Sequence, residues 1–168
     1  MRKAAIVVVI ALTATVQAWT LTRTWNGSVS SSWTDRNNWT PNDSAPQSGD
    51  DVVIPGSRPK YPSANVTGTI NSLGIQDGGS CTATGDFTVT NAVTVTGTTS
   101  VTSLTTATGF VFSVGSFSQT GGNSSTTLNG TTNVSGNFSV SGGTVNVGTN
   151  AFTAGAMTVS GGSFTQTG

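Results

Sequence analysis

The chain has 168 residues, of which 34% are apolar and only 7% are charged, and it contains no histidine and a single cysteine. Its six basic and six acidic residues cancel and form no basic cluster, which argues against nucleic acid as a partner because phosphate binding depends on clustered Lys and Arg. A single cysteine also excludes a framework of intramolecular disulfides.

The first eighteen residues have the order of a secretory signal peptide. Arg2 and Lys3 precede an apolar run, and the small residues Val16 and Ala18 fit the end of a cleavage site. The alternative is a buried N-terminal helix. We expect residues 1–18 to be removed and the mature chain to be secreted or held at the cell surface. No later run is long and apolar enough to span a membrane.

The segment 19–62 holds most of the chemically distinctive side chains. Trp25, Trp33 and Trp39 can bury a large apolar area, and the prolines among them lack the N–H donor that a further strand would need. We predict that this segment is an N-terminal cap. It includes a first strand, Asp-Asp-Val-Val-Ile-Pro, which begins at Asp50 and in which Val52 and Ile54 are expected to be buried.

From residue 63 to 168, apolar residues alternate with Thr and Ser. This alternation predicts strands with one buried face, and the β-branched Thr and Val favour an extended backbone. In the stretch 87–96 the buried set is expected to be Phe87, Val89, Val93 and Val95, and the outward set Thr88, Thr90, Thr94 and Thr96.

The alternating phrases recur with a period near 20 residues. A phrase that begins at Asn137 returns at Ala156, 19 residues later, and one that begins at Phe117 returns at Phe138, 21 residues later. Repeats in phase let equivalent side chains stack, so Phe138 is expected beside Phe117. The predicted fold is all-β, a parallel β-helix (β-solenoid) with coils of about 20 residues. The alternative is an antiparallel meander or sandwich.

A coil of this kind has two ends with unpaired backbone groups, and such ends need covering. The tryptophan-rich cap would cover the first. At the second, the sequence stops at Gly168 in the middle of a repeat. We therefore expect a fragment whose last coil is covered by the remainder of the same polypeptide or by a stacking subunit.

One segment resembles a known group of proteins. The order Trp25-Asn26-Gly27, Trp33, Asn38-Trp39, Pro46 and then 50–55 is similar to the N-terminal part of large secreted bacterial surface proteins of the Bacteroidetes type. The resemblance implies a right-handed parallel β-helix body, an adhesin-like role and export through a type IX secretion system.

The residues offer little for catalysis. The body from residue 63 contains only Asp77 and Asp86 as charged groups, and no histidine or glutamate is present to act as an acid or base. Cys81 is interpreted as a small buried hydrophobe, the alternative being a free reactive thiol. No catalytic or cofactor-binding residue is therefore predicted.

Three aspartates in the cap are candidates for a metal site. Asp43, Asp50 and Asp51 could together hold Ca²⁺, which prefers carboxylate oxygens. The alternative is that they are turn residues that satisfy backbone N–H groups at the start of a strand.

The expected function is that of a non-enzymatic structural or adhesive module outside the cell. The alternative is a ligand-binding solenoid that uses its Thr and Ser faces to bind glycans or ice. The ranks of Thr and Ser look mixed and the period drifts, which argues against a face that matches a lattice. A fragment of a polysaccharide-active β-helix enzyme is the third alternative.

Overall fold

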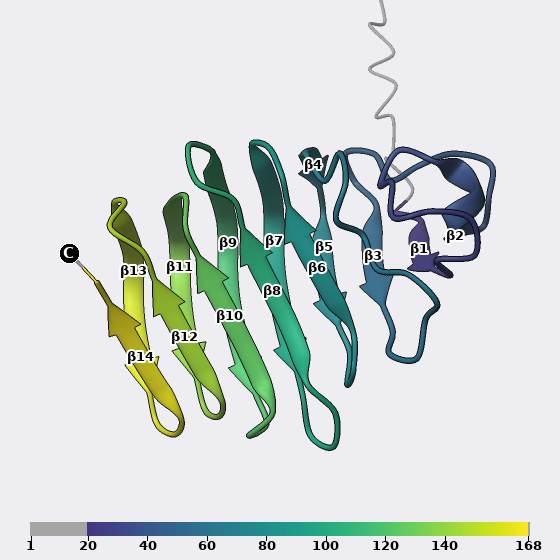
Figure 1. Ribbon diagram of the computed structural model, residues 1–168. Coiled ribbons are helices and arrows are strands. Elements are labelled where there is room, and N and C mark those ends of the chain that lie inside the picture. The colour runs from purple at the N-terminus through teal and green to yellow at the C-terminus, as the bar shows by residue number, and fades with distance from the viewer. Residues whose placement is uncertain (1–19, 168) are drawn as a thin grey trace, which may run out of the picture.

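The computed structural model describes residues 20–167, and the predicted signal peptide, 1–18, lies outside this range. Within it the strands wind into a coil of about six turns with about 21 residues in each turn (Figure 1). The chain is a β-solenoid, which confirms the predicted fold class. The antiparallel alternative is wrong, because only β2 pairs antiparallel among the described strands. None of the described helices is long and apolar enough to cross a bilayer.

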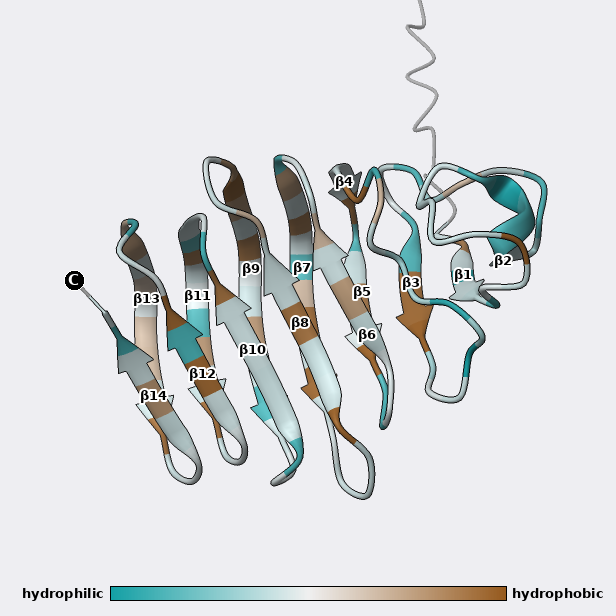
Figure 2. Cartoon of the chain, viewed as in Figure 1, coloured by the Kyte–Doolittle hydropathy of each residue, from teal (hydrophilic) through white to brown (hydrophobic). Residues whose placement is uncertain are grey.

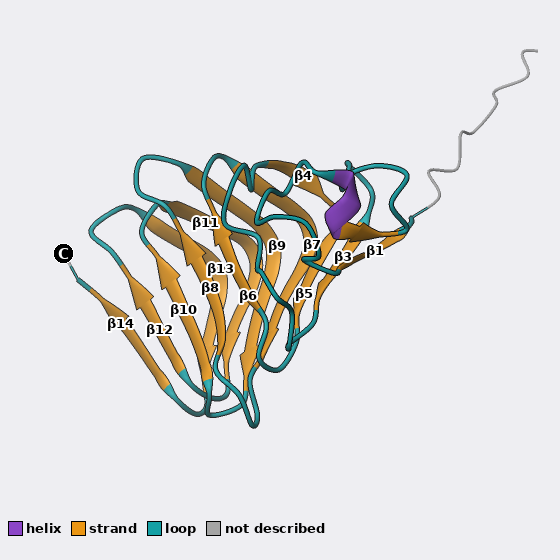
Figure 3. Cartoon of the chain, turned by 45° about the vertical axis from the view of Figure 1, so that its right-hand side comes forward, coloured by secondary structure: helices purple, strands orange, loops and turns teal. Residues whose placement is uncertain are grey.

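Two parallel sheets form the walls of the coil, and Figure 3 shows them facing one another. In the first sheet the strand order is β13-β11-β9-β7-β5-β3-β1-β2, with β4 beside β7; in the second it is β14-β12-β10-β8-β6. The first sheet consists of β1 (Thr22–Trp25), β2 (Trp39–Thr40), β3 (Asp51–Ile54), β4 (Gly68–Ile70), β5 (Ser72–Ile75), β7 (Phe87–Thr96), β9 (Val111–Thr120), β11 (Thr131–Val140) and β13 (Phe152–Val159). The second consists of β6 (Ser80–Ala83), β8 (Thr102–Thr106), β10 (Ser124–Leu128), β12 (Thr144–Val147) and β14 (Ser163–Gln166).

The long strands of the first sheet bend, so that each coil has three flat sides. β4 pairs with the first part of β7 and β5 with its last part, so one bent strand occupies the places of two. The register shifts at the bend, between Val89 and Ala92 and again between Val134 and Phe138. Asn91 lies at this bend and is exposed, although simple alternation from Val89 would turn it inward.

The core is a column of stacked apolar side chains. The four inward residues predicted in the stretch 87–96 are fully buried, and their Thr neighbours face outward, as expected. Brown, apolar bands recur between pale or teal ones on several strands, among them β8 and β12 (Figure 2). Phe117 and Phe138 stack with ring centroids 4.7 Å apart and an interplanar angle of 10°, which confirms the predicted pair. Phe87 and Phe112 stack at 6.2 Å.

The coils differ in length, and the differences lie in the turns. The first coil is the longest, since Thr22 aligns with Asp51 across 29 positions, whereas Asp51 aligns with Ser72 across 21. The extra residues of the first coil form a loop that carries η1 (Arg36–Asn38) and β2. Figure 3 places this helix and its loops at the β1 end of the solenoid.

The last coil is less covered than the others. β13 pairs only with β11 and β14 only with β12. Phe152 and Phe164 pack against the core but are only partly buried, and Met157 and Val159 are each 44% exposed. Val159 aligns with buried Val140, so its exposure reflects its place on the outermost described coil.

Candidate functional site

The three tryptophans of the cap close the N-terminal end of the core. All three are at most 2% exposed. Trp39 contacts Trp25 edge-on at a centroid distance of 4.9 Å and Trp33 edge-on at 4.8 Å. Trp33 in turn meets Phe87, the first ring of the phenylalanine column, at 5.6 Å. The predicted cap residues therefore form one aromatic cluster that continues into the core.

Hydrogen bonds hold this aromatic cluster in place. Trp25 Nε1 donates to the Lys60 carbonyl at 2.7 Å, and Trp39 Nε1 donates to the Trp33 carbonyl at 2.8 Å. Asn38, which is fully buried, accepts from the amides of Val29 and Ser30 and donates to the Ser32 carbonyl. The role of Asn38 was not predicted. Its position directly before Trp39 was the available signal.

Arg23 organises the carboxylates of the cap. Its side chain is almost fully buried and lies on the same strand face as Trp25. Its Nε donates to Asp50 Oδ2 at 3.2 Å, and its Nη1 binds Asp43 and the carbonyls of Pro41 and Ser44. These bonds raise the pKa of Arg23 against the opposing effect of burial, and they lower the pKa of Asp43.

Asp51, the third candidate metal ligand, has a different hydrogen-bond partner. Asp51 Oδ1 accepts a hydrogen bond from Asn71 Nδ2 at 2.7 Å, on the next coil. Asp43 and Asp50 are thus brought together on a guanidinium, and Asp51 is not part of that cluster. Among residues 20–167, no three His, Cys, Asp or Glu side chains lie close enough together to hold a metal ion.

Asp77 and Asp86, the two carboxylates beyond the cap, each accept hydrogen bonds from the following coil. Asp77 Oδ1 accepts from three successive amides, those of Thr98, Thr99 and Ser100, at 2.8 to 3.0 Å, and Oδ2 binds the Thr99 hydroxyl. The Thr99 hydroxyl, followed by these amides, lowers the pKa of Asp77 to about 2. Asp86 accepts from the Val111 amide at 2.8 Å. Asp77 therefore supports a turn of the following coil, and Asp86 supports the first residue of β9.

Cys81 lies in the interior of the second sheet. It is 1% exposed, and burial raises the pKa of its thiol to about 12. A thiol with so high a pKa is a poor nucleophile because almost none of it is ionised at neutral pH. The interpretation as a buried hydrophobe is confirmed.

A polar group inside the core escaped prediction. Gln119 is fully buried; its Oε1 accepts from Thr126 Oγ1 at 2.6 Å, and its Nε2 donates to the carbonyls of Gly142 and Thr144. These hydrogen bonds join Gln119 to β10, to the turn before β12 and to the first residue of β12. The signal for it lay in the repeat, because Gln119 aligns with Val140 and so occupies an inward position.

The outer face of the second sheet carries two unbroken ranks of small polar side chains. Neighbouring strands lie about 4.8 Å apart and residues i and i+2 about 6.7 Å apart, so the ranks form a regular grid. The five strands contain no charged residue. One rank is Ser80, Ser103, Ser125, Thr144 and Ser163, and the other is Thr82, Thr105, Thr127, Asn146 and Thr165.

The residue types remain mixed, as expected, because Thr144 lies in the first rank and Asn146 in the second, but strand pairing aligns the side chains in spite of the drifting period. Successive members of the first rank are 23, 22, 19 and 19 positions apart, so a fixed period does not align them. The loops absorb the difference in length, and strand pairing restores the alignment.

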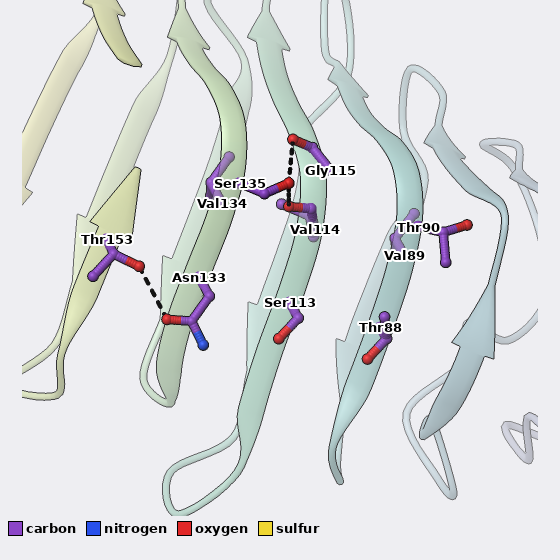
Figure 4. Close-up of a pocket in the computed structure, with 10 residues that line it drawn as sticks. All are labelled: Thr88, Val89, Thr90, Ser113, Val114, Gly115, Asn133, Val134, Ser135 and Thr153. Atoms are coloured by element: carbon purple, nitrogen blue, oxygen red, sulfur yellow. Dashed lines mark hydrogen bonds between the residues drawn. The ribbon is translucent and has the colours of Figure 1, made fainter. Parts of the chain in front are cut away.

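A groove of about 270 Å³ crosses four coils on the outer side of the first sheet, where its strands bend (Figure 4). Thr88, Ser113, Asn133 and Thr153 align from β7 to β13 as one rank along it. Its remaining lining comes from the residues that follow them at the bend, and none of the lining residues is charged. This groove was not predicted, because it depends on the bend of the strands.

The described residues define the class of protein as a parallel β-solenoid closed at its first coil by an aromatic cap. A family model for a domain of unknown function (DUF8693) matches residues 24–135, which are 112 of the 168 positions. The chain belongs to this family, and the match runs from the cap into β11. No curated protein and no solved structure matches the chain.

Proposed function

We propose that this chain is a non-enzymatic structural or adhesive module of a secreted or cell-surface protein. The observation that carries the proposal is the use of its carboxylates. Asp77 and Asp86 each bind backbone amides of the next coil, and Arg23 neutralises Asp43 and Asp50 within the cap. Groups that could act as an acid or base instead join one coil to another.

The rest of the fold supports a stiff spacer. The first sheet is hydrogen-bonded strand to strand from β1 to β13, and the second from β6 to β14. No buried side-chain nitrogen or oxygen among the described residues lacks a hydrogen-bond partner. A fully bonded, solenoid-shaped body gains about 4.8 Å in length with each coil, so further coils would extend the module without altering it.

The experiment is an assay of the purified mature segment against pectin, alginate and neutral polysaccharides, with and without Ca²⁺. We expect no turnover. Turnover that is abolished by Asp77→Asn or Asp86→Asn, with the fold intact by circular dichroism, would overturn the proposal and favour a polysaccharide-active enzyme.

Export is part of the same proposal and rests on the sequence of residues 1–18. N-terminal sequencing of the protein recovered outside the cell should begin at Trp19. Recovery of external protein that still begins at Met1 would contradict cleavage of a signal peptide.

A second candidate function is binding of ice by the outer face of the second sheet. It is favoured by the two ranks described above, which repeat over five strands without a charge. Hydroxyl groups on a flat grid can order water in two dimensions. The test is ice recrystallisation in the presence of the protein. Thr105→Lys, in the middle of one rank, should abolish any inhibition, and Thr94→Lys, outward on the first sheet, should not.

A further inference from the structure

The groove on the first sheet is a site open to solvent and lined by small neutral groups. Thr88 and Ser113 point outward from β7 and β9, and Asn133 follows on β11 (Figure 4). Val89 and Val114 alternate with them and anchor the strands in the core. The outward side chains are therefore fixed by strand pairing and are held in place before any ligand arrives.

The hydrogen-bonding capacity of this rank is only partly used. Thr153 Oγ1 donates to Asn133 Oδ1 at 3.0 Å, and Ser135 Oγ contacts the carbonyls of Val114 and Gly115 (Figure 4). Figure 4 draws no hydrogen bond from the Thr88 or Ser113 hydroxyl to another residue that lines the groove. These two hydroxyl groups and the Asn133 side-chain amide line the groove and can bond a ligand.

The dimensions suit an extended chain better than a compact molecule. The groove crosses four coils, and three spacings between them amount to roughly 14 Å. A volume of about 270 Å³ spread over that length is shallow and open. One member of the rank Thr88, Ser113, Asn133 and Thr153 faces the groove at each coil, and this spacing is comparable to the length of one sugar unit in an extended polysaccharide.

The absence of charge among the lining residues selects the chemistry of the ligand. A polymer of uronic acid, a sulfated glycan or a nucleic acid would need cationic partners for its anions, and the ten lining residues include no Lys or Arg. Thr and Ser hydroxyls and an Asn amide match the neutral hydroxyl groups of a sugar, each serving as donor or acceptor.

We propose that this groove binds a neutral polysaccharide chain that lies along the solenoid axis and contacts one polar side chain per coil. This inference depends on the proposed extracellular location in one respect, namely that the polysaccharide comes from outside the cell. Because each contact is a neutral hydrogen bond, affinity for a short oligosaccharide is low, and binding strengthens when several modules meet one long polymer.

The test is electrophoresis of the mature protein in native gels that contain a soluble neutral β-glucan or galactomannan. Polygalacturonate and dextran sulfate serve as charged comparison polymers. We expect retardation by at least one neutral polymer. Ser113→Leu should fill the groove and weaken retardation about tenfold, and Ser113→Thr should retain it because the hydroxyl remains.

The matched control is Ser118→Leu, which places the same side chain outward on the same strand, β9, beyond the bend. It should leave retardation unchanged. If Ser113→Leu fails to fold, Thr88→Leu tests the same groove one coil away. The proposal is overturned if no neutral polymer retards the protein, if charged polymers bind more tightly, or if Ser118→Leu weakens binding equally. Catalytic turnover of a polysaccharide would contradict the proposed non-enzymatic function. It would not change what gel retardation says about binding in the groove.

Discussion

At the scale of single residues, the polar groups inside the solenoid fix how neighbouring coils fit together. Gln119 is the clearest case, because its amide bonds Thr126 and two carbonyls of the following coil. A buried amide with all its partners stabilises only modestly, but removing one partner leaves the others unpaired in a dry interior. Gln119 should therefore matter more for specifying the arrangement than for total stability.

Gln119→Leu should lower the free energy of unfolding by about 1–3 kcal/mol, because Thr126 Oγ1 loses its acceptor and two carbonyls lose a donor. Adding Thr126→Val to it should recover part of this loss, since the unpaired hydroxyl is then also removed. Denaturant unfolding of the two variants measures the difference. A double variant that is less stable than Gln119→Leu would contradict the described network.

Asp77 makes the stability of the body depend on pH. Its pKa in the folded chain is lowered to about 2, below the unfolded value of about 3.9, so the native state binds fewer protons in between. Its stabilising effect is therefore present above about pH 4 and is lost as pH falls towards 2. The melting temperatures of wild type and Asp77→Asn should differ at pH 5 and converge near pH 2. A difference that stays constant over this range would refute the role assigned to Asp77.

Residue-level prediction succeeded where alternation alone decides the environment. Phe87 and Val95 are buried and Thr94 is exposed because strand geometry places successive side chains on opposite faces. Alternation alone does not place Asn91, because a bend interrupts it there. Residue-level prediction also missed Arg23, whose burial depends on two carboxylates that are 20 and 27 positions away in the sequence.

At the scale of elements, the cap acts as a lid on an otherwise open end of the solenoid. β2 pairs antiparallel with β1 and so places a two-residue strand at the edge of the first sheet. A very short edge strand offers few free backbone groups to another chain. The tryptophans of the same loop cover the apolar column, so the backbone and the side chains are protected together.

Trp33→Ala and Trp39→Ala should each lower the free energy of unfolding by roughly 3–5 kcal/mol, the usual range for a large buried aromatic side chain. The loss should also appear as aggregation, since the first coil is then uncovered. Val29→Ala is the control: Val29 belongs to the same loop and is 49% exposed, so it should change stability by less than about 0.5 kcal/mol. Tryptophan variants that remain monomeric and melt with the wild type would show that the cap is dispensable.

The presence of the elements was easier to predict than their alignment. The similarity of the phrases at Phe117 and Phe138 identified two stacked strands because those coils differ little in length. The ranks of the second sheet could not be found with one period, since Ser80 and Ser103 are 23 positions apart and Thr144 and Ser163 are 19. The groove could not be predicted for a related reason, because it forms only where β7, β9 and β11 bend.

At the scale of the whole molecule, the solenoid is a stack in which each coil is stabilised chiefly by its neighbours. In such a stack, stability is close to a sum of terms for each coil and for each interface between coils. Strands β3, β5 and β7 to β12 each pair on both sides, whereas β13 and β14, on the outermost described coil, each pair on one side. We propose that the free sides of β13 and β14 receive a further coil, from the same polypeptide or from a stacking subunit. Phe152 and Phe164 are the side chains that such a coil would cover.

This proposal predicts that adding a coil stabilises the chain. A variant in which residues 149–167 are repeated after Thr167 should melt at a higher temperature, because the new Phe, Met and Val side chains cover Phe152, Met157 and Val159. The control is the same extension with Ser at the inward positions that correspond to Phe152, Met157 and Phe164, which lengthens the chain without adding an apolar layer. Thermal denaturation of both variants measures the effect. Equal melting temperatures for the two extensions would show that the last coil does not accept another in register, and that the stacking seen between β11 and β13 ends there.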